Sequence, residues 1–274
     1  MVPIGLISCN FYSRALKRNT RFYAALPKEI VKGKLQVLYL LHGGGDNETK
    51  WLRRVPIERI FSGCKVLVIM PDGGLSYYTN TVCGENYWTY LSEELPKVVK
   101  TYFPVSEKRE DTFAAGLSMG GYGAMKLALK QPERFAKAAA FSGSLDMVRE
   151  IEVVLSDTKD REDFLGDYEM DETFYTSIFG NLDKVKGSPA DIYHLLEKYR
   201  GKAEGLPEIY QCCGTEDFLY RFNLIFKEAL LDLGARATFE EWTGGHDWVF
   251  WEEALRRAVR WFSFKNDYIS CGEV

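Results

Sequence analysis

The chain has 274 residues, of which 46% are hydrophobic and 27% are charged. This composition is typical of a globular protein and excludes a disordered chain, a collagen-like fibre and a coiled coil. With 35 Lys and Arg against 39 Asp and Glu, the net charge is −4. The sequence has no basic run, so we expect no binding to nucleic acid.

Targeting and cofactor signals are weak in this sequence. No stretch approaches the roughly 18 apolar residues of a membrane helix. In the N-terminal segment the basic residues follow the apolar stretch, the reverse of a signal peptide, so we expect a cytoplasmic protein without membrane contact. The six cysteines and three histidines lack ligand spacing, and we expect no disulfide framework, metal site or cofactor.

The first 26 residues predict two strands, and six further segments have strand-like sequences. Most of the later ones are continuous apolar runs, as expected for strands that are buried on both faces. The predicted strands cover 3–13, 20–26, 35–41, 65–71, 111–117, 137–143, 208–214 and 237–243. Helical patterns lie between most of them, at about 49–62, 86–102, 119–131, 219–233 and 247–262. This alternation predicts an α/β fold with a mostly parallel central sheet flanked by helices.

Residues 144–206 interrupt the alternation. They are rich in charge, have helical patches and contain no clear strand. A segment of this length inside a compact domain usually has a function or its own structure. We interpret residues 1–274 as one domain, with 144–206 as a cap-like helical insertion over the active-site edge of the sheet. The alternative is a surface excursion without a role in the site.

Gly116-Leu117-Ser118-Met119-Gly120 has the G-x-S-x-G pattern and stands between a predicted strand and a predicted helix. A sharp strand-to-helix turn lifts such a serine clear of the sheet, and glycines on both sides relieve the crowding. The helix dipole there favours developing negative charge. A serine that only caps the helix does not need both glycines. Ser118 is therefore the candidate nucleophile.

A nucleophilic serine needs a base, and the sequence offers three histidines. His246 follows the last predicted strand in a glycine-rich loop, the position that the order nucleophile, acid, histidine requires. We predict His246 as the base. His194 lies within a helical stretch and is interpreted as a surface or buried polar residue. His42 precedes three glycines and is interpreted as shaping that turn.

The acid of the triad is expected after a strand that lies between the serine and the histidine in the sequence. Asp217 and Glu216 both follow the predicted strand 208–214. We favour Asp217, because a short acid allows the closer approach, and keep Glu216 as the alternative. Asp247 is interpreted as the cap of the last helix.

Two backbone N–H groups must stabilise the oxyanion. One is predicted at Met119, directly after the nucleophile, and the other at Gly44, with Gly43 as the neighbouring alternative. Glycines there allow the backbone to approach the substrate closely. A phosphate-binding loop is excluded because no G-K-[ST] or G-x-G-x-x-G pattern follows.

Several aromatic residues stand near the predicted site. Tyr77 and Tyr78 follow the predicted strand 65–71, and Trp248 and Trp251 follow the histidine loop. We predict that Tyr77, Tyr78 and Trp248 bind substrate, although packing in the core is the commoner role of such residues.

The motifs together resemble the esterase D family of α/β-hydrolases, with most similarity to its bacterial tributyrin-esterase branch. That branch is near S-formylglutathione hydrolases, feruloyl esterases and the antigen 85 acyltransferases. The resemblance spans nearly the whole chain and depends on LLHGGGDNETKW, SYYTNTVCGENYWTYLSEELP, AGLSMGGYGAMKLAL, CGTEDFLY and GGHDWVFWEEAL. One departure is HGGGD where the family usually has His-Gly-x-x-Gly, which leaves the exact oxyanion donor open.

The resemblance implies an α/β-hydrolase fold and a serine carboxylesterase that cleaves short acyl esters, such as acetyl or butyryl esters, without a cofactor. It places the triad on Ser118, Asp217 and His246, and oxyanion donors on Gly44 and Met119. The expected partner is a small-molecule ester, which includes acetylated or feruloylated carbohydrates, and homo-oligomers are expected. Alternatives are a thioester hydrolase or an acyltransferase on the same fold, and a non-catalytic binding protein on this scaffold.

Overall fold

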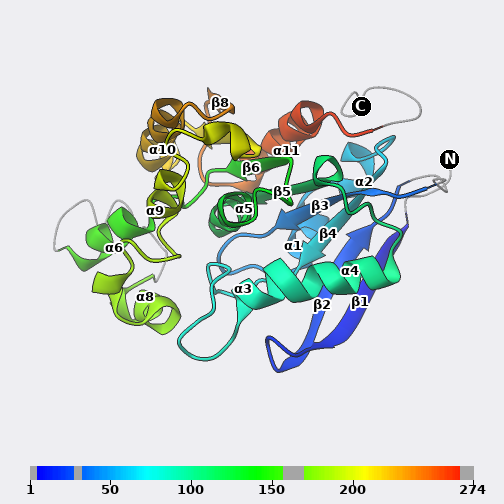
Figure 1. Cartoon of the computed structure of the whole chain (residues 1–274), viewed down its shortest axis with the longest axis horizontal. Helices are drawn as coiled ribbons and strands as arrows, with labels where there is room; N and C mark the ends of the chain where they lie inside the picture. The colour runs from blue at the N-terminus through cyan, green and yellow to red at the C-terminus, as the bar shows by residue number, and fades with distance from the viewer. Residues whose placement is uncertain (1–4, 28–32, 157–169, 266–274) are drawn as a thin grey trace.

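The computed structural model describes residues 5–27, 33–156 and 170–265. Its centre is an 8-stranded sheet with the order β1-β2-β4-β3-β5-β6-β7-β8 (Figure 1). From β4 to β8 the neighbours are parallel, while β2 pairs antiparallel with both β1 and β4. The mostly parallel α/β sheet is as predicted. The strands are β1 Leu6–Ser13, β2 Arg18–Ala25, β3 Gln36–Leu41, β4 Val66–Pro71, β5 Thr112–Leu117, β6 Lys137–Phe141, β7 Glu208–Gly214 and β8 Ala237–Trp242.

The helices follow the predicted segments with two differences. They are α1 Lys50–Arg54, α2 Ile57–Ile60, α3 Tyr87–Thr89, α4 Leu95–Tyr102, α5 Met119–Lys130, α6 Met147–Leu155, α8 Glu172–Phe179, α9 Ile192–Glu197, α10 Tyr220–Leu233 and α11 Trp248–Phe262. The predicted helix 49–62 is divided into α1 and α2 at Pro56, because a residue before proline avoids the helical conformation.

The predicted helix 86–102 contains a π-helical turn, η1 (Tyr90–Glu94), between α3 and α4. Pro96 lies in the first turn of α4 and has no N–H to donate to the carbonyl of Ser92. That carbonyl instead accepts a hydrogen bond from Arg134 Nη1 at 2.7 Å. The π-helical turn is thus explained by the missing N–H of Pro96. The Ser92 carbonyl, which lacks a helical partner, bonds to Arg134 instead.

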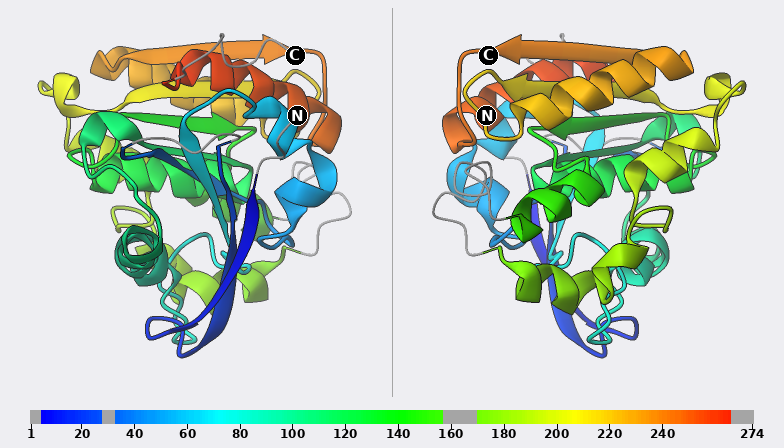
Figure 2. Two further views of the ribbon diagram at one scale, coloured as in Figure 1. Left: turned by 90° about the vertical axis from the view of Figure 1, so that its right-hand side faces the viewer. Right: turned by 90° about the vertical axis from the view of Figure 1, so that its left-hand side faces the viewer.

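Helices cover both faces of the sheet, which explains why the central strands are apolar along their whole length. In β3, Val37, Tyr39 and Leu41 belong to one core cluster, and Leu38 and Leu40 belong to the other. The first cluster lies under α4, α5 and α10, and the second lies under α1, α2 and α11. Figure 2 shows α11 on one side of the sheet and α4 and α5 on the other.

The insertion 144–206 is helical where it is described, with α6, α8 and α9 and no strand among those residues. Residues 157–169 of the insertion, residues 3–4 of the first predicted strand and Cys271 lie outside the described residues. In α8 the rings of Tyr175 and Phe179 lie 6.1 and 5.9 Å from the ring of Tyr77, which follows β4. The insertion therefore packs at the carboxyl edge of the sheet.

Within 5–27, 33–156 and 170–265, no helix combines the length and the apolar character that crossing a bilayer requires.

Candidate active site

Ser118 occupies a strained turn between β5 and α5. Its backbone angles are φ 52° and ψ −121°, a conformation that costs energy for a residue with a side chain. The Ser118 N–H donates to the carbonyl of Phe141 at 2.9 Å, which links the turn to the end of β6. A Cβ at Gly120 would lie 2.5 Å from the carbonyl oxygen of Leu41, and a Cβ at Gly116 would overlap the Gly120 carbonyl. The glycines of the pattern are thus required by backbone contacts.

The structure brings Ser118, His246 and Asp217 together from the ends of three strands. The distance from Ser118 Oγ to His246 Nε2 is 3.0 Å. His246 Nδ1 lies 2.9 Å from Asp217 Oδ2 and 3.0 Å from Oδ1. The carboxylate accepts the Nδ1–H, which fixes the tautomer in which Nε2 can accept the serine proton. The side chains of His246 and Asp217 are 8% and 0% exposed, so little water competes for these bonds.

Asp217 and Glu216 have different positions despite being neighbours. Asp217 Oδ1 also accepts a hydrogen bond from the Leu219 N–H at 2.8 Å, which holds the carboxylate in place. The Glu216 side chain is exposed, and its backbone N–H donates to the carbonyl of Gly244 at 3.0 Å. This bond ties the loop after β7 to the histidine loop after β8. Asp217 therefore contacts the imidazole, whereas Glu216 contributes only through its backbone.

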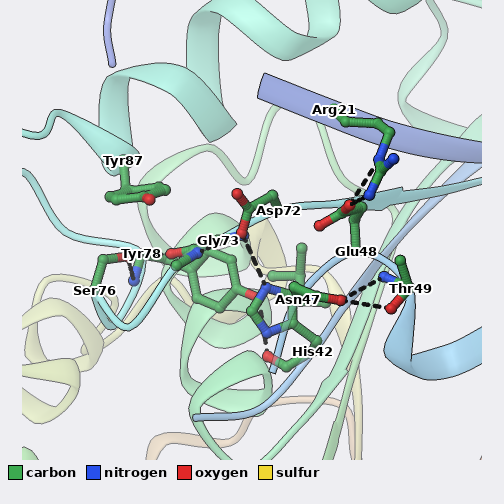
Figure 3. Close-up of polar contacts among 12 residues, drawn as sticks. Arg21, His42, Asn47, Glu48, Thr49, Asp72, Gly73, Ser76, Tyr78 and Tyr87 are labelled. Carbon is green, nitrogen blue, oxygen red and sulfur yellow. Dashed lines mark hydrogen bonds and ion pairs between the residues drawn. The ribbon is translucent and has the colours of Figure 1, made fainter. Parts of the chain in front are cut away.

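The other two histidines lie away from Ser118. His194 is exposed on α9. His42 is 1% exposed; its Nδ1–H donates to the Gly43 carbonyl, and Nε2 accepts from the Gly73 N–H, both at 2.8 Å. Figure 3 shows the ring beside Asp72 and Gly73. Burial lowers the pKa of His42, which favours the neutral ring. Its two hydrogen bonds link the glycine loop after β3 to the loop after β4.

The predicted oxyanion donors lie on two backbone segments beside Ser118. Met119 is the first residue of α5, where N–H groups have no acceptor within the helix. A Cβ at Gly43 would lie 3.4 Å from Ser118 Cβ, which shows how closely the glycine loop passes the serine. Gly44 is the next residue of this loop. Both backbone segments thus lie next to the serine, and the assignment of the donors to Met119 and to Gly44 or Gly43 stays a prediction.

Tyr77 and Tyr78 are buried, at 3% and 1% exposure. The Tyr78 hydroxyl donates to the carbonyl of His42 at 2.9 Å and thereby supports the glycine loop (Figure 3). The Tyr77 N–H points at the sulfur of Met119, 3.3 Å away. Both tyrosines adopt positive φ, at 48° and 47°. They position the predicted oxyanion segments, and direct contact with substrate stays a prediction.

Trp248 is half-buried at the start of α11, next to the histidine loop. Its ring packs edge-on against Trp51 at 5.2 Å and Trp251 at 5.3 Å. Asp247 caps α11 by accepting hydrogen bonds from the N–H groups of Val249 and Phe250, as predicted. Contact of Trp248 with substrate stays a prediction.

Sequence reasoning missed a buried polar cluster beneath the nucleophile. The Ser144 N–H donates to the Ser118 carbonyl at 3.2 Å, and the Ser144 hydroxyl contacts a carboxylate oxygen of Glu150. Glu150 is 1% exposed on α6, and burial raises its pKa to about 8. The helical pattern around Glu150 is visible in the sequence, but the contact of this cluster with the turn that carries Ser118 is not. In the part of the chain that is described, no group of His, Cys, Asp and Glu could hold a metal ion.

The chain is similar to known proteins over most of its length. The family model described as "Putative esterase" matches residues 13–262. An acetyl esterase of Caldicellulosiruptor saccharolyticus is 34% identical, over 96% of this chain and 100% of the relative.

Two solved structures from Staphylococcus aureus are similar over nearly their whole length. The fluorophosphonate-binding serine hydrolase FphF has a TM-score of 0.83 and 34% identity, covering 95% of this chain and 98% of its own. The S-formylglutathione hydrolase FrmB has a TM-score of 0.80 and 33% identity, covering 94% and 98%. With these neighbours, the predicted α/β-hydrolase fold is confirmed.

Proposed function

Since this chain belongs to the esterase family and is a carboxylic ester hydrolase, we propose that it hydrolyses short-chain acyl esters through an acyl-enzyme on Ser118. The observation that carries the proposal is the continuous hydrogen-bonded path from Ser118 Oγ through His246 to Asp217, with distances of 3.0 and 2.9 Å. We further propose that it belongs to the esterase D group, in the tributyrin-esterase branch.

In the first half of the proposed reaction, Ser118 Oγ attacks the ester carbonyl while His246 Nε2 takes the hydroxyl proton. Asp217 stabilises the imidazolium that forms. The N–H groups of Met119 and Gly44 donate to the oxyanion of the tetrahedral intermediate. The intermediate collapses, the alcohol leaves with the proton from His246, and the acyl group remains on Ser118.

In the second half, His246 removes a proton from water, and the resulting hydroxide attacks the acyl-enzyme. The second tetrahedral intermediate collapses and releases the carboxylic acid, and His246 returns the proton to Ser118 Oγ. The short-chain preference is supported by the name of the acetyl esterase relative, and a natural ester on an acetylated or feruloylated carbohydrate is compatible with it.

Hydrolysis of p-nitrophenyl acetate and butyrate tests the proposal. We expect His246→Ala to lower kcat by about 10⁴-fold or more while the protein stays folded. His194→Ala is the matched control, because its imidazole is exposed on α9, and it is expected to retain full activity. Equal activity of the two variants would contradict the mechanism.

A second candidate function is thioester hydrolysis, which the 33% identity to FrmB favours. A screen from acetyl to decanoyl esters, with S-formylglutathione, methyl ferulate and acetylated xylo-oligosaccharides, separates the two. A higher kcat/KM for S-formylglutathione than for every oxygen ester would favour the thioesterase. Adding a competing alcohol to the assay and analysing the products distinguishes hydrolysis from acyl transfer.

A further inference from the structure

A cavity of about 350 Å³ lies beside α5, the helix that follows Ser118, and Ser118 is not among the residues that line it. Its walls come from α5, from the segment after β4 through α3, and from α8 and the residues that follow it. Figure 1 labels α3, α5 and α8. We call it the lysine cavity, because three of its lining residues are Lys126, Lys130 and Lys184. Its volume is at the lower end of the range for small-molecule sites.

Lys126 is the unusual residue of the lysine cavity. It is 1% exposed, and its ammonium group donates to Thr79 Oγ1 at 2.6 Å and to the Tyr78 carbonyl at 3.4 Å. Among the described residues no carboxylate forms an ion pair with it. A buried ammonium without a counterion is costly, and burial holds the pKa of Lys126 well below its usual range, with the nearby Lys130 as a further cause.

The ionisable side chains that line the cavity are all lysines. The ammonium groups of Lys126 and Lys130 lie 5.3 and 4.4 Å from the ring centroid of Trp88, so both lie next to this ring. Lys184 is exposed, and no Asp or Glu stands among the residues that line the cavity. Among the described residues neither Lys130 nor Lys184 has a carboxylate partner. An anion in the cavity would pair with Lys130 and favour the protonated form of Lys126.

The lining of the cavity also has an apolar part, which includes Ile178, Phe179 and Val185. A ligand that fits both the lysines and this apolar part has a negatively charged group and a small apolar group. We propose that the lysine cavity binds a small organic anion, whose carboxylate or phosphate group lies between Lys126 and Lys130 and whose apolar part contacts Ile178 and Phe179.

This site is separate from the ester-hydrolysing one. Lys126 is two helical turns beyond Ser118, about 12 Å along the axis of α5. The proposal therefore does not depend on the reaction at Ser118, and Ser118→Ala is expected to bind the anion as the wild type does.

Isothermal titration of the full chain with butyrate, phenyl phosphate and inorganic phosphate tests the proposal. We expect saturable binding of butyrate or phenyl phosphate, tighter than that of inorganic phosphate, and the tighter of the two identifies the head group. Lys126→Met is expected to weaken this binding at least about tenfold. Lys202→Met is the matched control, because Lys202 is an exposed lysine 6.0 Å from the Tyr199 ring and does not line the cavity.

Thermal unfolding separates a ligand-binding role from a structural one. Met is apolar and of similar length, so Lys126→Met is expected to keep or raise the Tm while it loses the anion. Should Lys126→Met fail to fold, Lys130→Met, a change at a half-buried position, must show the weaker binding instead. Unchanged affinity in the folded variants overturns the proposal, as does the absence of saturable binding of all three anions up to about 20 mM.

Discussion

The buried carboxyl group of Glu150 predicts a pH-dependent stability. The group lies next to Ser144, whose N–H bonds to the Ser118 carbonyl. Its Oε1 has no hydrogen-bond partner among the described residues. Burial raises its pKa to about 8 from an ordinary value of 4.5. The folded state therefore keeps its proton over a pH range in which the unfolded chain has released it. A raised carboxyl pKa makes stability highest below the ordinary pKa, and stability falls as the pH rises towards 8.

Glu150→Gln removes this ionisation and leaves the shape nearly unchanged. Each pH unit between the two pKa values corresponds to about 1.4 kcal/mol. From about pH 5 to about pH 8, the free energy of unfolding of the wild type should thus fall, relative to the variant, by on the order of 3 kcal/mol. A constant cost of placing an amide at this position cancels, because only the change with pH is compared.

Urea unfolding at the two pH values measures this difference, with the free energy obtained from the midpoint and slope. Glu152→Gln is the matched control, since Glu152 is exposed on the same helix, α6, and its difference from wild type should not change with pH. A Glu150→Gln difference that stays constant between the two pH values would refute the argument that this carboxyl is neutral in the folded protein.

Three further predictions test the site. Gly120→Ala places a Cβ 2.5 Å from a backbone carbonyl oxygen at the end of β3, and is expected to cost more than about 2 kcal/mol of unfolding free energy in urea titrations; a cost near zero would contradict the turn geometry. Asp217→Asn should lower kcat for p-nitrophenyl butyrate by about 10³- to 10⁴-fold, whereas Glu216→Gln should change it less than about twofold; the reverse order would move the acid to Glu216. Tyr78→Phe removes the hydrogen bond to the glycine loop and should lower stability by about 1 to 2 kcal/mol, with a lower kcat and little change in KM; a change in KM alone would instead favour substrate binding.

The centre of the sheet was predictable because its strands β3, β4 and β5 are buried on both faces. The apolar run at 35–41 has no polar alternation, and the structure places its side chains in two separate core clusters. The helix at 49–62 was predicted as continuous, although Pro56 divides it. The spacing of apolar residues alone does not show where a proline interrupts a helix. The π-helical turn before Pro96 was missed for the same reason.

The juxtaposition of the candidate site residues followed from strand order, because Ser118, Asp217 and His246 all stand just after parallel strands. The supporting contacts could not be predicted in this way. His42 bonds to the Gly73 N–H, and Ser144 bonds to the Ser118 carbonyl. These contacts depend on which loops lie side by side, and the sequence pattern carries no signal for that.

Covalent labelling of the chain by a fluorophosphonate probe tests the central claim, that Ser118 is the nucleophile of this ester hydrolase. Mass spectrometry of the intact protein and of its peptides, with esterase activity measured in parallel, gives both stoichiometry and position. We expect one probe molecule per chain on the peptide that contains Ser118, a loss of activity in proportion to the labelling, and no labelling of Ser118→Ala. Full labelling of another residue, or activity that persists in the labelled protein, would contradict the account.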